Sequence, residues 1–544
     1  MTAPARPDPP SLRRAAGTMA VATTVSRLTG FLRTVVLVAA IGLGLVGDAY
    51  NTANTLPNIV YELLLGGVLT SVIVPLLVHA RVRDGDGGLA YTQRLLSLLT
   101  VGLVVATVLA VLAAPLLTYA YGIRDNADQV ALANLLARIL LVEIVFYGVG
   151  AMLTAILNSR QVFGPPAWAP VLNNLVVIAT GLVFLAVSGA GELTPTTISP
   201  GLVWLLGIGT TLGIVVQAAA LLPSLHRAGV RWAWRWDWRH AGLGEAGRLG
   251  LWVLGYVAVS QAGYVVILAL ANQAGRDSGV GSIVYANASL LFQLPYGIIG
   301  VALLTALLPR MSRAAAEADL PAVISDLSLG ARLTALPLVP VSVALVVFGP
   351  AIATVAFSRG QVDAEQARVV GVVLAASAFG LLPYAVTLLQ LRVFYAMKDA
   401  RTPTLINLAM VAVRVPLCLL VPSVLPASDV VTGLAVVNSA TFVVGAVVGE
   451  LWLRHRLGRL QTARVLRTVG LLVLASAVAG AAGWTILQPI ETAFGLGVLG
   501  SSLGILAGSL GGGAVLLAGC LVLPIPEVRE LVSAVRGRFA GSGR

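Results

Sequence analysis

The chain has 544 residues, of which 58% are hydrophobic and only 11% are charged, and its mean hydropathy is +0.92. This composition excludes a soluble globular protein, because apolar runs of about 20 residues, each long enough to cross a bilayer as a helix, recur along the whole chain. The net charge of +12 would by itself suggest nucleic-acid binding, but the distribution of the basic residues argues against it.

Fourteen membrane-spanning helices are predicted in chain order, and the expected fold class is therefore an all-α, polytopic membrane protein. The spans are expected at about 17–43, 50–80, 93–120, 129–157, 167–188, 200–223, 246–272, 282–308, 330–356, 367–394, 403–421, 429–453, 465–487 and 495–523.

The basic residues are distributed unevenly between the gaps that separate these spans. Most of the 35 Lys and Arg residues lie in or beside the even-numbered gaps or in the two tails. The odd-numbered gaps and their borders hold only Arg124, Arg276, Arg359 and Arg368. The positive-inside rule therefore predicts that both termini are cytoplasmic. The stretch RWAWRWDWRH (231–240) is interpreted as a cytoplasmic loop with interfacial tryptophans, with anionic-lipid contact as the alternative.

The first predicted span has a polar face that includes two arginines. On a helical wheel, one arc of about 120° contains only small, polar or cationic residues. They are Thr23, Ser26, Arg27, Gly30, Arg33 and Thr34. Arg27 lies roughly 15 Å along the helix from its inner end, where a charge needs a partner, a water-filled cavity or a function. A salt bridge that only holds helices together is one interpretation of the two arginines. The polar face favours the other, which is contact with a substrate.

The second predicted span carries a matching polar stripe. Asn51, Asn54, Asn58 and Glu62 fall within about 80° on the wheel. The rise per residue places Glu62 near the depth of Arg27. Two roles stay open for Glu62, which are an ion pair with an arginine of the first span, expected to be Arg27, and the coupling of a proton or cation to transport.

Four further charges lie within predicted spans. Arg138 and Glu143 are five positions apart and face different ways, which favours structural roles. Arg392 is expected to extend toward the inner membrane surface from the end of its span. Arg414 is more central, and its role stays open.

The neutral polar residues give no sign of catalysis. Asn287, Ser289 and Gln293 of the eighth span are expected to form interhelical hydrogen bonds. Cys418 and Cys520 lie in apolar spans, and the four histidines lack ligand spacing. The sequence therefore predicts no catalytic residue, no metal site and no cofactor.

Two pairs of segments indicate an internal duplication. LGGVLTSVIVPLL (65–77) resembles IGVALLTALLPRM (299–311), and APVLNNLVVI (169–178) resembles PTLINLAMVA (403–412). Both pairs are separated by 234 positions, which predicts a tandem repeat of six helices. An even number of helices keeps its orientation in the membrane, so the repeat is expected to be parallel.

The expected organisation follows from this repeat. It comprises a cytoplasmic tail (1–16), an N-lobe of spans 1–6 (17–224), a cytoplasmic loop (225–245), a C-lobe of spans 7–12 (246–460), two additional spans (461–524) and a second cytoplasmic tail (525–544). Paired lobes are typical of transporters that bind substrate in a cleft between the lobes and work by alternating access.

Four motifs carry a resemblance to a known family. SRLTGFLR (26–33), GDAYNTANTLPN (47–58), QLPYGIIGVALLTALLPRMS (293–312) and RVFYAMKDARTP (392–403) resemble the MurJ (MviN) family, the lipid II flippases of the MOP exporter superfamily. The resemblance covers nearly the whole chain, including the number of spans and the order of the motifs.

The resemblance implies a transporter of the cell membrane, not an enzyme. It implies that lipid II, the lipid-linked peptidoglycan precursor, is moved from the inner to the outer leaflet. The family's cavity arginines correspond to Arg27 and Arg33, and an acidic residue to Asp48. Spans 13 and 14 correspond to a groove for the polyprenyl tail. The implied partners are lipid II and membrane lipids, not nucleic acid, and a partnership with cell-wall synthesis proteins is left open.

Two positions depart from the family pattern. Tyr61 and Glu62 stand where members often carry a basic pair, and Leu290 stands where many have an arginine. The group that holds the headgroup in the second lobe is therefore open between Arg392 and Arg414. The predicted substrate-binding residues are Ser26, Arg27, Gly30, Arg33, Asp48, Asn51, Asn54, Asn58, Glu62, Arg392 and Arg414.

Two other function classes remain as alternatives. A small-molecule or drug antiporter of the same superfamily should favour acids over arginines in its cavity and would not need spans 13 and 14. A membrane-embedded enzyme or scaffold would need a His, Asp or metal cluster at one membrane face, and the sequence shows none.

Overall fold

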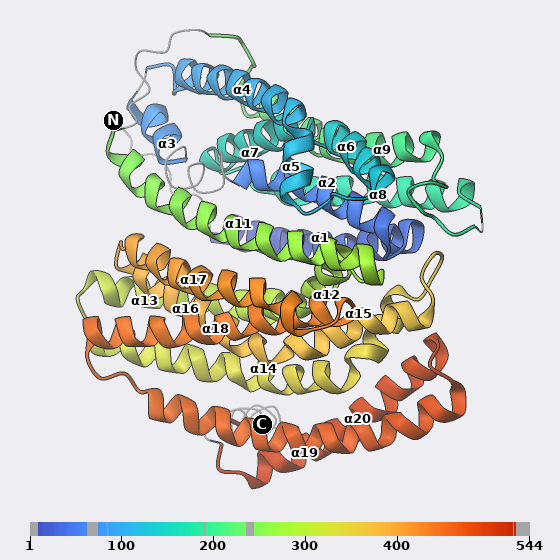
Figure 1. Ribbon diagram of the computed structural model, residues 1–544. Coiled ribbons are helices and arrows are strands. Elements are labelled where there is room, and N and C mark those ends of the chain that lie inside the picture. The colour runs from blue at the N-terminus through green and yellow to red at the C-terminus, as the bar shows by residue number, and fades with distance from the viewer. Residues whose placement is uncertain are drawn as a thin grey trace. The chain divides into compact units, whose positions relative to one another are not determined.

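The computed structural model describes residues 9–62, 74–83, 85–189, 191–235, 244–525 and 527–528. These residues form helices joined by short connections, with no strand among them (Figure 1). Contacts between residues divide the chain into two compact units, Met1–Gln261 and Ala262–Arg544. The division falls inside α11 (Gly244–Ser278), so each unit includes one part of that helix.

Unit 1 is built from helices in the first half of the chain. They are α1 (Pro9–Ile41), α2 (Leu45–Tyr61), α3 (Val74–Arg83), α4 (Leu89–Leu112), α5 (Ala114–Ala120), α6 (Ala127–Leu140), α7 (Glu143–Ser159), α8 (Gly164–Val187), α9 (Pro200–Ala219) and α10 (Leu222–Arg227). Helix α1 packs along α8, which packs on α9, while α2 lies against α6 and α4 lies against α7. The polar residues of α1 and α2 are thus held by long apolar neighbours.

Unit 2 contains the remaining helices. They are α12 (Ser282–Pro295), η3 (Tyr296–Gly300), α13 (Val301–Ala316), α14 (Leu320–Phe357), α15 (Ala364–Ser377), η4 (Ala378–Gly380), α16 (Leu381–Ala396), α17 (Arg401–Val424), α18 (Ala427–Leu457), α19 (Thr462–Phe494) and α20 (Val498–Val522). Helix α14 contacts α13, α15, α16, α19 and α20, so it organises this unit.

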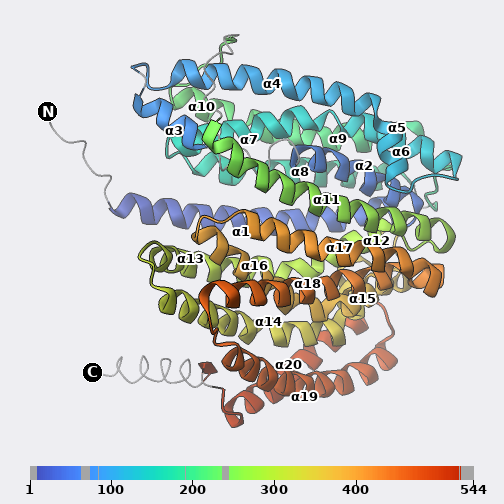
Figure 2. The same cartoon turned by 60° about the vertical axis from the view of Figure 1, so that its left-hand side comes forward.

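Helices α19 and α20 form a closely packed pair, visible side by side in Figures 1 and 2. Small residues allow the close approach, because a Cβ added at Gly508 would lie 2.9 Å from the carbonyl oxygen of Gly483. Packing through small residues is typical of helices inside membranes, where backbones must meet closely to gain dispersion contacts.

The predicted spans agree with the structure wherever the structure describes them. Among the described residues, 13 helical segments are long and apolar enough to cross a membrane. The predicted span at 50–80 is the one without a counterpart, and residues 63–73 of it lie outside the described part of the chain. The all-α, polytopic fold class is confirmed.

The order of helices also repeats between the two halves. Asn173 lies buried in α8, and Asn407 lies buried in α17, 234 positions later. The fourth span is interrupted between α6 and α7, and the tenth is interrupted at η4 between α15 and α16. A break at corresponding places supports the duplication inferred from the sequence.

The segment after α20 is held to unit 2 by apolar packing and by an ion pair. Ile525 is fully buried against Ala335 and Leu472. Glu527, which is 3% exposed, forms an ion pair with Arg332 of α14. These contacts tie the end of the α19–α20 pair to the central helix of the unit.

Candidate functional site

The two arginines of α1 lie on a helix that is anchored by an asparagine of α8. The Nδ2 of Asn174 donates to the carbonyl oxygen of Ser26 and to the hydroxyl of Thr29, both at 3.0 Å. A Cβ added at Gly30 would lie 3.5 Å from the same amide nitrogen. Ser26 and Gly30 therefore face α8, and Gly30 gives Asn174 room to approach. Sequence reasoning placed both residues on the polar face but could not identify this neighbour.

Arg27 and Arg33 differ in their surroundings. Arg27 is exposed, whereas Arg33 is partly buried and its Nε atom is enclosed without a hydrogen-bond partner among the described residues. Arg33 acts electrostatically on Tyr50 of α2 and on Glu143 at the start of α7. Arg33 thus lies within electrostatic range of a polar cluster of unit 1 that includes Tyr50 and Glu143.

The polar stripe of α2 lies on the more open side of that helix. Asn58 is exposed, and Asn51, Asn54 and Glu62 are partly exposed, whereas Leu56 and its neighbours on the other side are buried. In the described part of the chain, no ion pair joins Glu62 to an arginine of α1, so the expected pair with Arg27 is absent. A helical wheel shows which residues share a face of one helix, but it does not show how α2 is rotated relative to α1. The wheel therefore could not predict whether Glu62 faces Arg27.

Asp48 is fully buried in the first turn of α2. A carboxylate is favoured there, because the N-terminal end of a helix carries a partial positive charge. Its burial indicates that it shapes the site from within unit 1 and does not face an open surface.

The two predicted arginines of the second half both lie in unit 2. Arg414 of α17 is 8% exposed, and a Cβ added at Gly263 of α11 would lie 3.5 Å from its guanidinium carbon. Arg392 of α16 is exposed and acts electrostatically on Tyr296. Arg414 therefore belongs to the interior of the unit, and Arg392 to its accessible surface.

An aromatic cluster occupies unit 2 where α12 passes into the π-helical turn η3. Tyr384 has its ring centroid 4.9 Å from that of Phe442, 5.0 Å from that of Tyr296 and 6.1 Å from that of Phe292. Pairs at these separations add to the stability gained from burial. Turns of π-helix often occur at functional sites, so η3 is a marked feature of this span.

Among the described residues, the two amides of α12 bond within their own helix and not, as expected, to a neighbouring one. Asn287 donates to the carbonyl of Ile283, and Gln293 donates to the carbonyl of Ser289, both within the same helix. The prediction was wrong for these two residues, because an amide side chain can reach the carbonyl one turn earlier on its own helix.

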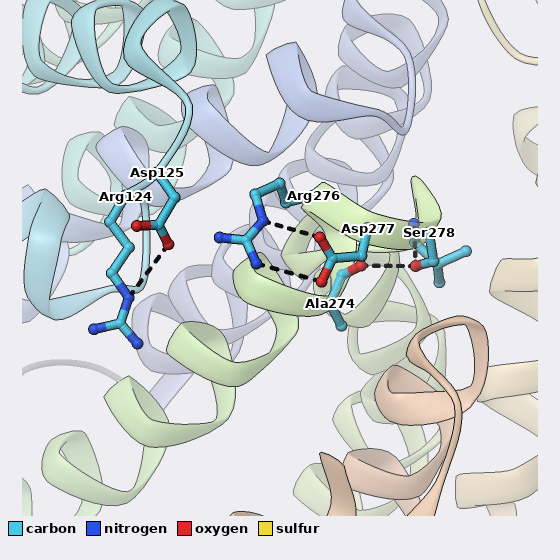
Figure 3. Close-up of polar contacts among 7 residues, drawn as sticks. Arg124, Asp125, Ala274, Arg276, Asp277 and Ser278 are labelled. Atoms are coloured by element: carbon cyan, nitrogen blue, oxygen red, sulfur yellow. Dashed lines mark hydrogen bonds and ion pairs between the residues drawn. The ribbon is translucent and has the colours of Figure 1, made fainter. Parts of the chain in front are cut away.

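The arginines of the odd-numbered gaps are engaged locally. The Nε of Arg124 lies 3.9 Å from Asp125, a contact drawn in Figure 3. Figure 3 also shows Arg276 bonded twice to the neighbouring Asp277, with Nε to Oδ1 at 3.0 Å and Nη2 to Oδ2 at 3.3 Å. Arg359 donates to two carbonyls at the end of α14. Each of these arginines therefore forms its polar contacts with residues that are close to it in the sequence.

Arg368 lies in a pocket of about 320 Å³ formed by α14, α15 and α19. It forms a two-pronged ion pair with Glu491, with Nη1 to Oε1 at 2.9 Å and Nη2 to Oε2 at 3.4 Å. The rest of the lining is largely apolar and includes Pro350, Trp484 and Leu487. The pocket combines a polar end with an apolar wall.

The tryptophan-rich stretch is held against α4 as far as the structure describes it. Gln93 donates to the carbonyl of Arg231 at 2.8 Å, and the Nε of Arg235 donates to the side-chain oxygen of Gln93 at 2.8 Å. The backbone N–H of Arg235 donates to Ser97. The rest of the predicted loop (236–243) lies outside the described residues.

The turn between α16 and α17 is held by a carboxylate. Asp399 accepts from the backbone N–H of Thr402 at 3.0 Å and from its hydroxyl at 2.7 Å, and it pairs with Arg456 of α18. Burial raises the pKa of Asp399, but these hydrogen bonds and the charge of Arg456 outweigh it and hold the pKa below its usual value.

Comparison with known proteins identifies the family. The family model described as "Lipid II flippase MurJ" matches residues 37–503. A relative from Rhizobium meliloti, described as a probable lipid II flippase MurJ, is 30% identical over 429 residues, which cover 78% of this chain and 77% of the relative. This chain belongs to the MurJ family. Arg27 and Arg33 precede the matched stretch, so the match does not extend to them.

A second relative carries the same description, and two solved structures share the fold. A lipid II flippase MurJ from Burkholderia cenocepacia is 28% identical over 412 residues, covering 74% of this chain and 77% of the relative. The fold resembles a solved MurJ structure in an inward closed conformation, with a TM-score of 0.74, 19% identity and coverage of 94% and 99% of the two chains. It also resembles a multidrug resistance transporter of the MATE family, with a TM-score of 0.62, 17% identity and coverage of 81% and 98%.

Proposed function

We propose that this protein is a flippase that moves lipid II from the inner to the outer leaflet of the cell membrane by alternating access. The observation that carries the proposal is the pair of α1 arginines in a chain of the MurJ family. Lipid II carries a pyrophosphate, and guanidinium groups bind phosphate oxygens through two parallel charge-assisted hydrogen bonds. Translocation breaks no covalent bond, so the protein acts as a transporter.

Different residues of the proposed site bind different parts of the lipid II headgroup. Arg27, which is exposed on α1, receives the pyrophosphate, and Arg33 supports it from the polar cluster of unit 1. The amides of Asn51, Asn54 and Asn58 on the open side of α2 bind the sugar and peptide groups, because amides both donate and accept hydrogen bonds.

The remaining predicted residues have supporting roles in this proposal. Ser26 and Gly30 fix α1 to α8, and Asp48 shapes the start of α2. In unit 2, the exposed Arg392 is the stronger candidate for headgroup contact, because the burial of Arg414 leaves its guanidinium among protein groups.

The α19–α20 pair receives the polyprenyl tail. The pocket beside α19 supports this part of the proposal, because its apolar wall suits an isoprenoid chain and its volume of about 320 Å³ suits a short portion of one. Replacing Leu487 in this wall by Asn should weaken the capture of long-chain polyprenyl substrates more than that of short-chain ones.

Both termini are cytoplasmic in the proposed topology. The excess of basic residues in the even-numbered gaps supports it. A reporter fused after Arg464 should read cytoplasmic, and one fused after Gly191 should read external. The opposite pair of readings would contradict the proposed topology, because it would place the basic gaps outside the cell.

The decisive experiment depletes the protein in its native host and assays the leaflet distribution of lipid II. Lipid II should accumulate in the inner leaflet and return to its normal distribution when the gene is restored. A normal distribution under full depletion, with no second flippase expressed, would overturn the proposal. The same cells discriminate the drug-antiporter alternative, which predicts sensitivity to cationic drugs with lipid II distributed normally.

A further inference from the structure

A buried carboxyl group inside unit 1 has no place in the function described above. Glu143 is 0% exposed, and neither of its carboxylate oxygens has a hydrogen-bond partner among the described residues. It is the first residue of α7, directly after the break that separates α7 from α6 within one membrane span. Ionisable groups inside membranes are costly and mark functional sites by default.

Polar groups from three other helices surround this carboxyl. Arg33 of α1 acts on it electrostatically, although no ion pair between the two is formed in the described part of the chain. Thr211 of α9 lies close enough for its hydroxyl to favour the carboxylate, and the same hydroxyl lies 3.5 Å from the carbonyl oxygen of Ile139. Tyr50 of α2 and Tyr147 of α7 share the same electrostatic environment. The hydroxyl of Tyr50 is already bonded to Thr210 at 3.0 Å.

The other charged groups on neighbouring helices lie elsewhere. Arg81 of α3 donates to the carbonyl of Ser159, which places it at the opposite end of α7 from Glu143. Helix α10, with His226 and Arg227, lies at that same end of α7, because Arg160 donates to the carbonyl of Ala228. The start of α4, with Arg94, also lies there, because Gln93 donates to the carbonyl of Arg231. Arg138 of α6 is exposed. Helix α2 carries Asp48 near its start and Glu62 at its end. Arg33 is therefore the cation whose charge acts on Glu143.

We propose that Glu143 is a proton-binding site whose charge state sets how tightly Arg33 holds an anion. Two features of the fold favour the ionised carboxylate, which are the positive end of α7 and the guanidinium of Arg33. Complete burial favours the neutral acid. The balance between these opposing effects decides whether the carboxyl binds a proton, and an anion that engages Arg33 shifts this balance toward the neutral acid.

The ligand is a proton and not a metal ion. Among the described residues, no group of three or more His, Cys, Asp or Glu side chains gathers around a common point. Glu143 offers a single carboxylate, and the positive charge of Arg33 repels a cation. A proton needs one carboxyl oxygen and no further ligand.

The consequence for transport rests on the proposed function. When Glu143 is ionised, its negative charge offsets that of Arg33, and a pyrophosphate is held weakly. When Glu143 is protonated, Arg33 is left for the anion. By linkage, anion binding favours proton uptake by the same factor, and couplings of this kind are typically about 5–150-fold. Release of the proton on one side of the membrane would then loosen the substrate there.

The test uses the full-length protein in lipid nanodiscs and two readouts. Infrared difference spectra between acidic and alkaline pH should show the carbonyl band of a buried protonated acid in the wild type. The band should be absent in Glu143→Gln and retained in Glu365→Gln, a matched change at an exposed glutamate. Separately, the affinity for a short-chain polyprenyl pyrophosphate should rise as pH falls, by about tenfold or more in the wild type.

The glutamine variant imitates the protonated acid and gives a distinct outcome. Glu143→Gln should bind the probe as tightly as the wild type does at low pH, with the pH dependence lost. An unchanged infrared band, or an unchanged pH dependence of binding in Glu143→Gln, would overturn the proposal. If Glu143→Gln does not fold, Glu143→Asp retains an acid in a displaced position and should shift the midpoint of the pH dependence. An unshifted midpoint would count against Glu143.

The two proposals can fail separately. If the wild type does not bind the pyrophosphate probe while the infrared band still depends on Glu143, the proposed substrate chemistry and its coupling are wrong and the proton site stands. If the probe binds but Glu143→Gln alters neither readout, the proton site is wrong and the proposed function stands.

Discussion

The two repeats share a framework but differ in chemistry at corresponding positions. Arg33 of α1 is matched, 234 positions later, by Ile267 of α11, which is fully buried. Asn51 and Asn58 of α2 are matched by Tyr285 and Phe292 of α12. Charge and amides in the first repeat are thus replaced by apolar and aromatic groups in the second.

This difference shows that the helical frame and the binding chemistry are specified separately. Apolar faces and packing contacts determine the frame, and they are present in both repeats. The groups suited to an anionic headgroup gather in the first repeat. The aromatic cluster around Tyr384 gives the second repeat a packed interior at the place where the first has an open polar stripe.

The largest effect on transport is expected from the α1 arginines. Arg27→Ala or Arg33→Ala should lower lipid II transport by about 10–150-fold, because a charge-assisted hydrogen bond contributes about 1.5–3 kcal/mol. Lysine should restore little, since it keeps the charge but loses the planar fork. Transport is measured per inserted molecule in cells depleted of the native protein. Gln261→Ala, at the position that corresponds to Arg27, is the control and should transport normally; equal losses at both positions would abolish the contrast between the repeats.

The second contrast concerns stability. Phe292→Ala should lower the free energy of unfolding by about 3–5 kcal/mol, because Phe292 is buried in the aromatic cluster. Asn58→Ala, at the corresponding position of α2, should change it by no more than about 0.5 kcal/mol, because Asn58 is exposed. Thermal unfolding in one detergent compares the two variants. A large loss for Asn58→Ala would show that the stripe of α2 is structural.

An intermediate effect is expected at the ion pair of α19. Glu491→Gln should destabilise the protein by about 1–3 kcal/mol, because Glu491 is 5% exposed and holds Arg368 through two contacts. The control in the first repeat is Asp125→Asn, in a pair whose side chains are 40% and 60% exposed. It should cost at most about 0.5 kcal/mol, and Asn also tolerates the positive φ of 70° at this position. Similar losses in both variants would show that burial does not distinguish the pairs.

The smallest effect concerns the corresponding turns of the two repeats, whose contributions to stability should differ in their dependence on pH. The turn between α7 and α8 is held by Arg160, which donates to a carbonyl at 2.6 Å, whereas the turn between α16 and α17 is held by Asp399. The folded-state pKa of Asp399 is lowered, so its contribution is present above the unfolded-state pKa of about 3.9 and is lost as pH falls through the lowered value. Asp399→Asn should cost about 1 kcal/mol at neutral pH and progressively less on acidification. A cost that is constant with pH would contradict the role of the charge.

The sequence predicted the frame well because the signals for it are local. Long apolar runs specify spans, and a shared offset of 234 specifies the repeat. The site was harder, because its contacts depend on how helices rotate against one another. Gly30 lies against Asn174, which is distant along the chain, and no ion pair joins Glu62 to Arg27 among the described residues. The complete burial of Glu143 could not be predicted either, because the break before α7 leaves no clear mark in the sequence and α7 packs on helices from distant parts of the chain, among them α2, α4 and α9.

The interruption of the fourth and tenth spans also records the history of the chain. Glu143 stands at the first interruption, and Ser377 stands 234 positions later, directly before η4. A break at the same place in both halves is what a duplication of one six-helix unit that already carried the break would produce. The acid is found in one copy and a serine in the other, so this difference arose after the copies were joined. The break is therefore common to both halves, whereas the acid beside it belongs to the first half alone.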